Sequence, residues 1–237
     1  MSPCRAWAWL TLGYTWSITL FGVTGDAPLK ALRQPDCFTR VVQACPLHTH
    51  WLDGKPITGV LPMAGVLDRH RQFAVDGQPV VTGFGAVGDA WACTNPSAGR
   101  GLSVGLIHAQ LLRNVVRAHL DDPGGFARAW DDHTDQFVAP FYWNQVAADR
   151  ARVAEMAALR DGRQPPERNS MMDRLVRAAS QDADVFRALL ETVLCLALPQ
   201  EVLQRPGIKD RVDTLANGGP IQIPGPDRAQ LLRLLGP

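Results

Sequence analysis

The sequence lacks an excess of charge of either sign, and it has no internal repeat or low-complexity segment. Lysine and arginine (24) nearly balance aspartate and glutamate (23), which leaves a net charge of +1. Such a chain has no field that attracts nucleic acid or an anionic membrane, so the expected partner is a small molecule. The 237 residues, 46% of them hydrophobic, are enough for one large core or two small ones.

Paired cysteine spacing is also missing. The chain has five cysteines, and an odd number at scattered positions does not describe a disulfide framework. We therefore expect a reducing, cytoplasmic environment. The cysteines are Cys4, Cys37, Cys45, Cys93 and Cys195.

Metal-ligand spacing is present only in part. His48 and His50, with Cys45 nearby, could share one face of a strand and bind a metal ion. No second ligand pair follows at zinc spacing, so no metal site is expected. The other histidines stand among charged residues and are expected at the surface: His70, His108, His119 and His133.

One uncharged segment, residues 6–24, follows a single arginine and leaves a signal peptide or short membrane span open as an alternative. Its Thr and Ser content, the interruption at Gly13 and the absence of a small-residue cleavage site weaken that interpretation. The alternation of apolar and polar residues instead favours strands. We expect a hairpin or a single long strand here.

Beyond this segment, the pattern predicts a mixed region followed by helices. Asp26 is the expected N-cap of the first helix. Residues 79–86, a short apolar run, are predicted to form a buried strand of a parallel sheet. The expected helices span residues 28–33, 35–44, 102–120, 126–159, 171–180, 182–198, 206–216 and 227–235, with strand pieces at 51–60 and 73–75.

Residues 83–88 match G-x-G-x-x-G, the phosphate-binding fingerprint of a Rossmann turn. The fingerprint works only when its glycines lead directly from a strand into a helix. Asn95-Pro96 and Gly99 intervene, so no helix can begin before about Gly101. We therefore reject the dinucleotide-binding interpretation of this match.

The longer segment 87–106 contains Gly88-Asp89-Ala90, then Asn95-Pro96, then Gly99-Arg100-Gly101 at the start of a predicted long helix. In this order and spacing it resembles the second flavin motif of FAD-dependent monooxygenases (aromatic-hydroxylase-like flavoproteins) and geranylgeranyl-reductase-like proteins. The resemblance implies FAD as the cofactor. It implies that Asp89, beside Gly88, accepts a hydrogen bond from a ribitol hydroxyl, and that Pro96, Gly99, Arg100 and Gly101 line the flavin.

The residue types suit that role on physical grounds as well. A helix N-terminus offers unpaired N–H donors and a positive dipole end, which favours a reduced flavin anion. Glycines at Gly99 and Gly101 permit close approach of the backbone. The alternative is that Gly88-Asp89 is an ordinary turn and residues 95–101 only begin a helix.

The fold that the resemblance implies is an incomplete FAD/NAD(P)-binding flavoprotein fold of the α/β (α+β) class with a mostly α-helical C-terminal region. Residues 1–78 would form part of a substrate-side mixed region, residues 79–120 the last strand, flavin loop and helix of the FAD domain, and residues 121–237 the helical region. The Rossmann half that holds the ADP part of FAD is expected to be missing.

The expected function is therefore that of a truncated or split FAD-dependent oxidoreductase, which acts with a separately encoded N-terminal half. The reaction would be flavin-mediated oxidation, reduction or monooxygenation of an apolar small molecule. No catalytic residue is named, because the flavin itself performs such chemistry. The alternative is a non-catalytic remnant or helical interaction protein that no longer binds FAD.

Two further residue groups near the motif favour ordinary packing. Cys93 has no visible resolving partner, so we expect a plain small residue rather than a redox thiol. The aromatic residues that follow recur at helical spacing and are expected in the core: Trp130, Phe137, Phe141, Tyr142 and Trp143.

Overall fold

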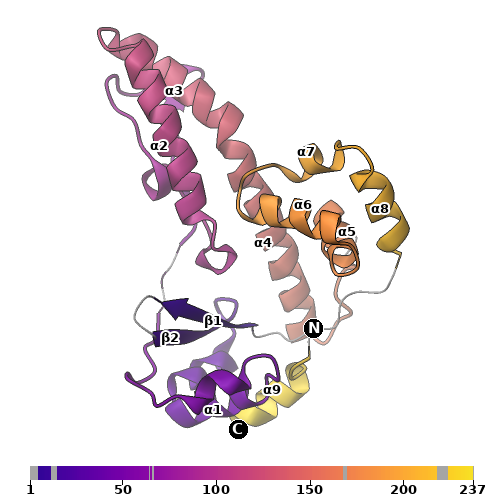
Figure 1. Cartoon of the computed structure of the whole chain (residues 1–237). Helices are drawn as coiled ribbons and strands as arrows, with labels where there is room; N and C mark the ends of the chain where they lie inside the picture. Colours follow the sequence, from indigo (N-terminus) through magenta and orange to yellow (C-terminus); the bar gives the residue numbers. More distant parts are fainter. Residues whose placement is uncertain are drawn as a thin grey trace. The chain divides into compact units, whose positions relative to one another are not determined.

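The computed structural model describes residues 5–11 (backbone only), 15–63, 65, 67–167, 170–217 and 224–236 (Figure 1). It divides into two compact units. The terminal unit comprises Met1–Gly65, Arg152–Glu167 and Ile221–Pro237, and the central unit comprises Val66–Ala151 and Arg168–Pro220. Both contain far more helix than strand, so the fold is an α-rich mixed one.

Short elements precede the long helices in chain order. The strands are β1 (Arg5–Thr11), β2 (Thr15–Phe21), β3 (Arg69–His70), β4 (Ala74–Val75), β5 (Gln78–Pro79) and β6 (Ala92–Cys93). The 3₁₀ helices are η1 (Ala27–Arg33), η2 (Thr49–Asp53), η3 (Gly88–Ala90) and η4 (Pro96–Ala98). The α-helices are α1 (Pro35–Gln43), α2 (Gly101–Ala118), α3 (Pro123–Phe137), α4 (Ala139–Arg160), α5 (Met171–Ala179), α6 (Ala183–Val193), α7 (Pro199–Leu203), α8 (Ile208–Leu215) and α9 (Arg228–Leu235).

The terminal unit begins with an antiparallel hairpin in which Arg5 is opposite Phe21 and Thr11 opposite Thr15. Of the two predicted alternatives, a hairpin and a single long strand, the structure shows the hairpin. The connecting residues 12–14 lie outside the described part of the chain. Trp16 extends from β2, and its indole N–H donates to the carbonyl of Trp51 at 2.8 Å. A Cβ on Gly54 would lie 2.3 Å from this indole, so only glycine fits there.

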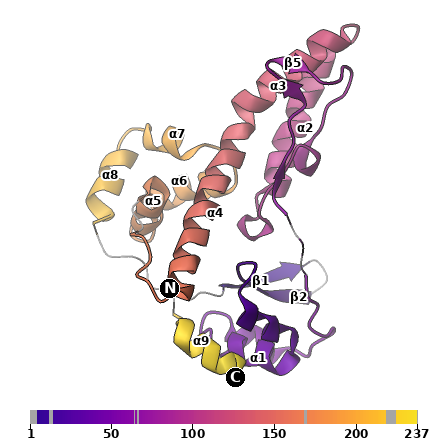
Figure 2. The same cartoon turned by 180° about the vertical axis from the view of Figure 1, so that it is seen from behind.

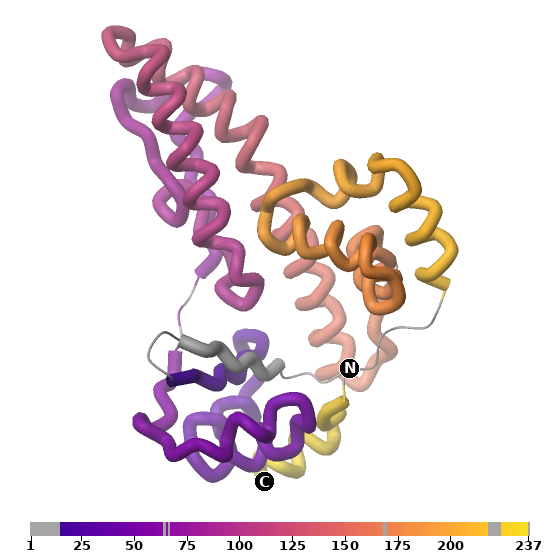
Figure 3. The backbone as a smooth tube through the Cα atoms, in the orientation of Figure 1, coloured from indigo at the N-terminus to yellow at the C-terminus, as the bar shows by residue number. Residues whose placement is uncertain are grey.

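The two ends of the chain pack together in the terminal unit. Helix α9 lies against α1 (Figure 3), and their buried side chains form one small core: Cys37, Val41, Leu231 and Leu235. Asp26 does not cap η1 as predicted. Its carboxylate instead pairs with both guanidinium nitrogens of Arg228, so a long-range ion pair replaces the local cap.

Two predicted strands are wrong. Residues 51–60 contain the end of η2 followed by irregular chain. Residues 79–86 form only the end of the β4–β5 hairpin, then bends and irregular chain, and Val80, Val81 and Phe84 are exposed. An apolar run becomes a buried strand only when neighbouring strands accept its hydrogen bonds, and the described sheets are all two-stranded and antiparallel.

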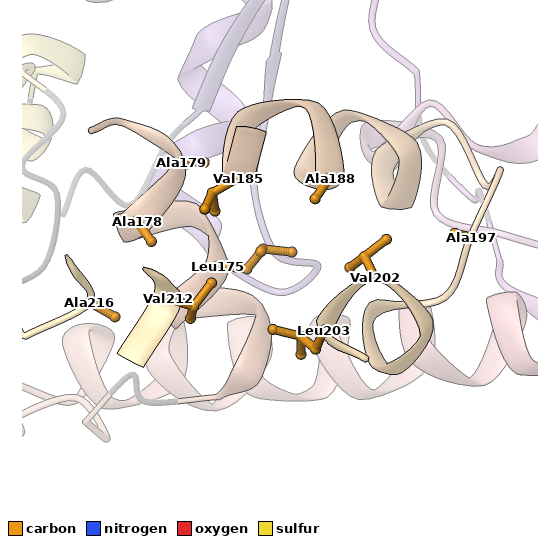
Figure 4. Close-up of a cluster of buried hydrophobic side chains, with 10 residues drawn as sticks. All are labelled: Leu175, Ala178, Ala179, Val185, Ala188, Ala197, Val202, Leu203, Val212 and Ala216. Atoms are coloured by element: carbon orange, nitrogen blue, oxygen red, sulfur yellow. The ribbon is translucent and has the colours of Figure 1, made fainter. Parts of the chain in front are cut away.

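The helical prediction is confirmed with changes at the boundaries. The helix expected over 126–159 is divided at Val138, because Pro140 cannot continue the hydrogen-bonding ladder of α3. Helix α6 ends before Cys195, whose φ of 59° is left-handed. Helices α5 to α8 enclose a core in which Leu175, Val185 and Val212 are fully buried (Figure 4).

In the described part of the chain, no helix is both long enough and apolar enough to cross a membrane.

Candidate functional site

The turn at Gly88–Ala90 lies directly against helix α2. Gly88 has a positive φ of 56°, and a Cβ there would lie 3.5 Å from the Cα of Gly105 on that helix. Helix α2 contacts this turn and runs side by side with α3 (Figure 2). Positive φ and close backbone approach both favour glycine, so the paired glycines set the turn close to the helix.

The turn is held on one side by His108, which is fully buried rather than at the surface as predicted. Its Nδ1 lies 3.2 Å from the backbone nitrogen of Gly88, and its Nε2 lies 2.9 Å from the hydroxyl of Thr134. The ring stacks on Trp130 with a centroid distance of 4.4 Å. Burial lowers the pKa of His108 to about 4, so the imidazole is neutral near pH 7.

Arg71 holds the same turn through its backbone carbonyls. Its guanidinium donates to the carbonyls of Asp89 and Ala90 at 3.0 and 3.2 Å. The backbone N–H of Arg71 also donates to the carbonyl of Trp91 at 2.9 Å. These bonds occupy the main chain of the turn and leave the Asp89 carboxylate unused.

The Asp89 carboxylate stands beside the first residue of α2. A Cβ on Gly101 would lie 3.7 Å from Asp89 Oδ1 and 3.7 Å from the hydroxyl of Thr94. Asp89 is exposed, and among the described residues its carboxylate has no hydrogen-bond or ion-pair partner. A side chain at Gly101 would cover one face of this carboxylate, which glycine leaves open.

The N-terminus of α2 is not capped by a side chain. Arg100 at the N-cap position makes no side-chain capping bond, and the N–H of Val104 bonds to the Arg100 carbonyl. The N–H groups of the first turn therefore have no partner within the helix. The result is a carboxylate acceptor next to backbone donors that no described side chain caps, which suits a ligand that carries both hydroxyl and carbonyl groups.

The loop that precedes α2 is fixed by side-chain hydrogen bonds. Asn95 Oδ1 accepts from the N–H of Ser97 at 3.0 Å, and Asn95 Nδ2 donates to Asp149 Oδ1 at 3.0 Å. Gln145, also on α4, donates to the other Asp149 oxygen at 2.9 Å. Gly99 closes η4 with a φ of 68°. These contacts tie the loop to helix α4 and to its own backbone.

The pKa values of three titratable groups around the loop are raised. Burial, then the nearby Asp89 and Asp68, raises the pKa of the Cys93 thiol. Burial, then Asp149, raises the pKa of Asp68. Burial likewise raises the pKa of Tyr142, to which Asp68 adds. A raised thiol pKa reduces the thiolate fraction, which disfavours a nucleophilic or redox role for Cys93.

The sequence motif predicted the main residues of the site but not the side chains that hold them in position. The structure brings Gly88, Asp89 and Gly101 together, while Pro96 and Gly99 lie on η4 and its C-cap just before α2. The supports that motif reasoning missed are Arg71, His108 and Asp149. Of these, His108 falls on the apolar periodicity of α2, and that position was a signal for burial.

The aromatic and histidine predictions have mixed outcomes. Trp130 and Tyr142 are buried as expected, whereas Phe137 and Trp143 are 44% and 49% exposed. His48 precedes η2 and His50 lies on it, so they do not share a strand face. Within the described ranges, no group of three metal-ligating side chains is gathered.

No protein-family model matches the chain, and no curated protein matches its sequence.

Proposed function

We propose that this chain carries the flavin-contacting segment of an FAD-dependent oxidoreductase, which acts on an apolar small molecule. The observation that carries the proposal is the free Asp89 carboxylate beside the uncapped first turn of α2. A flavin and its ribitol chain present hydroxyl donors and ring carbonyl acceptors. Those groups match the carboxylate and the backbone N–H groups of this site.

In this proposal, Asp89 binds the ribitol and the backbone from Pro96 to Gly101 faces the ring. Bound FAD would supply the hydride or oxygen chemistry, so the chain needs no acid, base or nucleophile of its own. The protein holds the acceptor and donors in place through Arg71 and His108. The positive end of the α2 dipole lowers the energy of an anionic reduced ring.

The ADP part of FAD requires a second binding region. The glycines of residues 83–88 lead into η3, a 3₁₀ helix of 3 residues, and not into an α-helix, so they offer no α-helix N-terminus for a pyrophosphate. We propose that a dinucleotide-binding half, separately encoded or elsewhere in the same protein, supplies this region. The exposed side chains of Val80, Val81 and Phe84 are candidates for the surface it covers.

The flavin contact is tested by replacing its carboxylate. We expect Asp89→Ala to weaken FAD binding about tenfold or more, since a hydrogen bond to a charged group contributes about 1.5–3 kcal/mol. Titration of isotope-labelled protein with FAD, followed by the amide signals of Asp89 and Gly101, measures the affinity even when binding is weak. The matched control is Asp132→Ala, an exposed aspartate on α3. Equal affinities for the two variants would contradict the assignment of Asp89.

A second function, that of a helical interaction protein, is favoured by one specific observation. Helix α6 carries exposed apolar side chains at helical spacing, namely Phe186, Leu190 and Val193, followed by Leu194 after its last turn. Their exposed fractions are 40–52%. An apolar stripe of this kind is typical of a surface that associates with another helix.

That alternative predicts self-association through α6. We expect the double change Phe186→Ser with Leu190→Ser to weaken the affinity of dimerisation at least tenfold. The change removes two large apolar contacts of about 1–2 kcal/mol each. Sedimentation velocity over a range of concentrations measures the change. Leu102→Ser with Leu106→Ser, on the exposed face of α2, is the matched control. Identical sedimentation of both variants and the parent would exclude association through α6.

A further inference from the structure

His108 makes more specific contacts than a residue that only fills space. It lies on α2 but contacts the turn through Gly88, helix α3 through Thr134 and Trp130, and the ring of Trp91. The side chain is completely inaccessible to solvent. Both ring nitrogens therefore have to find their partners within the protein.

The donors and acceptors around the ring determine its tautomer. The backbone N–H of Gly88 can only donate, so Nδ1 has to accept and carries no proton. The proton of the neutral ring is then on Nε2, which donates to the hydroxyl of Thr134. A buried hydrophobic residue of similar size would leave the Gly88 N–H without this acceptor.

The Gly88 bond acts on the residue that follows it. Gly88 is the first residue of η3, and its close approach to Gly105 sets where the turn meets α2. Asp89 is next in the chain, so its carboxylate lies beside Gly101 only while Gly88 stays in place. Arg71 bonds the carbonyls of the turn and does not replace the contact to the Gly88 N–H.

We propose that His108 is a positioning residue of the flavin site, whose unprotonated Nδ1 holds the Gly88 N–H and thereby keeps the Asp89 carboxylate at the N-terminus of α2. The expected effect of His108 on flavin binding rests on the proposed function. The contact by which His108 holds Gly88 is a feature of the structure itself. Because His108 is fully buried, it would act through the turn and not by contact with the ligand.

Two substitutions distinguish the roles of the two ring nitrogens of His108. In His108→Asn, the amide oxygen can take the place of Nδ1 and accept from Gly88. In His108→Gln, the longer amide reaches toward the position of Nε2 and leaves Gly88 without its acceptor. Thr134→Val removes the partner of Nε2 only and is the control for a purely structural loss, because Thr134 is also buried and its hydroxyl contacts Nε2 rather than Nδ1.

The first measurement needs no flavin. Nitrogen-15 NMR of the imidazole in the parent chain distinguishes a protonated from an unprotonated nitrogen, and we expect the proton on Nε2. We also expect the Gly88 amide to exchange faster with solvent in His108→Gln than in His108→Asn or Thr134→Val. A proton on Nδ1, or equal Gly88 exchange in all variants, would overturn the positioning role whatever the protein binds.

The second measurement adds FAD and follows the amide signals of Asp89 and Gly101. We expect His108→Gln to weaken binding about tenfold, with His108→Asn and Thr134→Val closer to the parent. If the parent does not bind FAD even when the dinucleotide-binding half is supplied, while the NMR results hold, the proposed function fails and the role of His108 in holding the turn stands. Binding by His108→Gln as tight as that of the parent would overturn the inference.

Discussion

Lowering the pH from about 6.5 to about 4 is expected to reduce the free energy of unfolding of the central unit by about 3 kcal/mol through His108. Burial lowers the pKa of this residue from 6.5 to about 4. A depressed folded pKa means that the unfolded chain binds the proton first as the pH falls. The contribution of the neutral ring is therefore complete above about pH 6.5 and is lost as the pH falls to about 4.

Comparison of the parent with His108→Asn isolates this effect. The groups in contact with the ring, which are Gly88, Trp91, Trp130 and Thr134, do not titrate in this range. Carboxyl groups elsewhere in the unit do titrate. Burial raises the pKa of Asp131, so protonation of this residue stabilises the folded state in acid, opposite to the effect of His108. Urea unfolding at several pH values gives the free energy of unfolding of both proteins. If the two free energies change with pH in parallel, His108 is solvated in the folded state.

Loss of the ion pair between Asp26 and Arg228 is the second large expected effect. The two side chains are 8% and 17% exposed, and they join segments 202 residues apart. Removing one partner of a buried pair leaves the other charge without compensation, at a cost of about 3–5 kcal/mol. We expect Arg228→Ala to destabilise the terminal unit by about 3 kcal/mol and to release α9.

An exposed pair of the same type provides the control. Arg187 and Asp184 on α6 are 70% and 53% exposed, so Arg187→Ala is expected to cost less than about 1 kcal/mol. Urea unfolding gives the two free energies, and hydrogen exchange of the α9 amides shows whether that helix has separated. A cost for Arg228→Ala no greater than that for Arg187→Ala would mean that the apolar contacts of α9 suffice without the ion pair.

Local patterns in the sequence determined the helices and the hairpin. Apolar residues at helical spacing predicted α2, α5 and α9 within one or two residues at nearly every end. Asp76 and Gly77, a pair typical of tight turns, connect β4 and β5, and both have positive φ. These features depend on neighbours a few residues away, which the sequence displays directly.

The candidate site was predictable only as a motif. The spacing from Gly88 to Gly101 indicated a loop before a helix, and that order is found. The contacts that fix the loop come from Arg71, His108 and Asp149, which are 18, 20 and 54 residues from their partners. Nothing in a local pattern tells which distant side chain will supply such a bond.

The failures have the same origin. Whether residues 79–86 form a strand depends on a neighbouring strand, and whether Asp26 caps a helix depends on whether a distant cation competes for it. The sequence alone determined the local elements, because hydrophobic periodicity and turn chemistry are local. Only the tertiary structure decided the burial of His108 and the partners of Asp26 and Gly88, because burial and long-range pairing depend on the packing of distant segments.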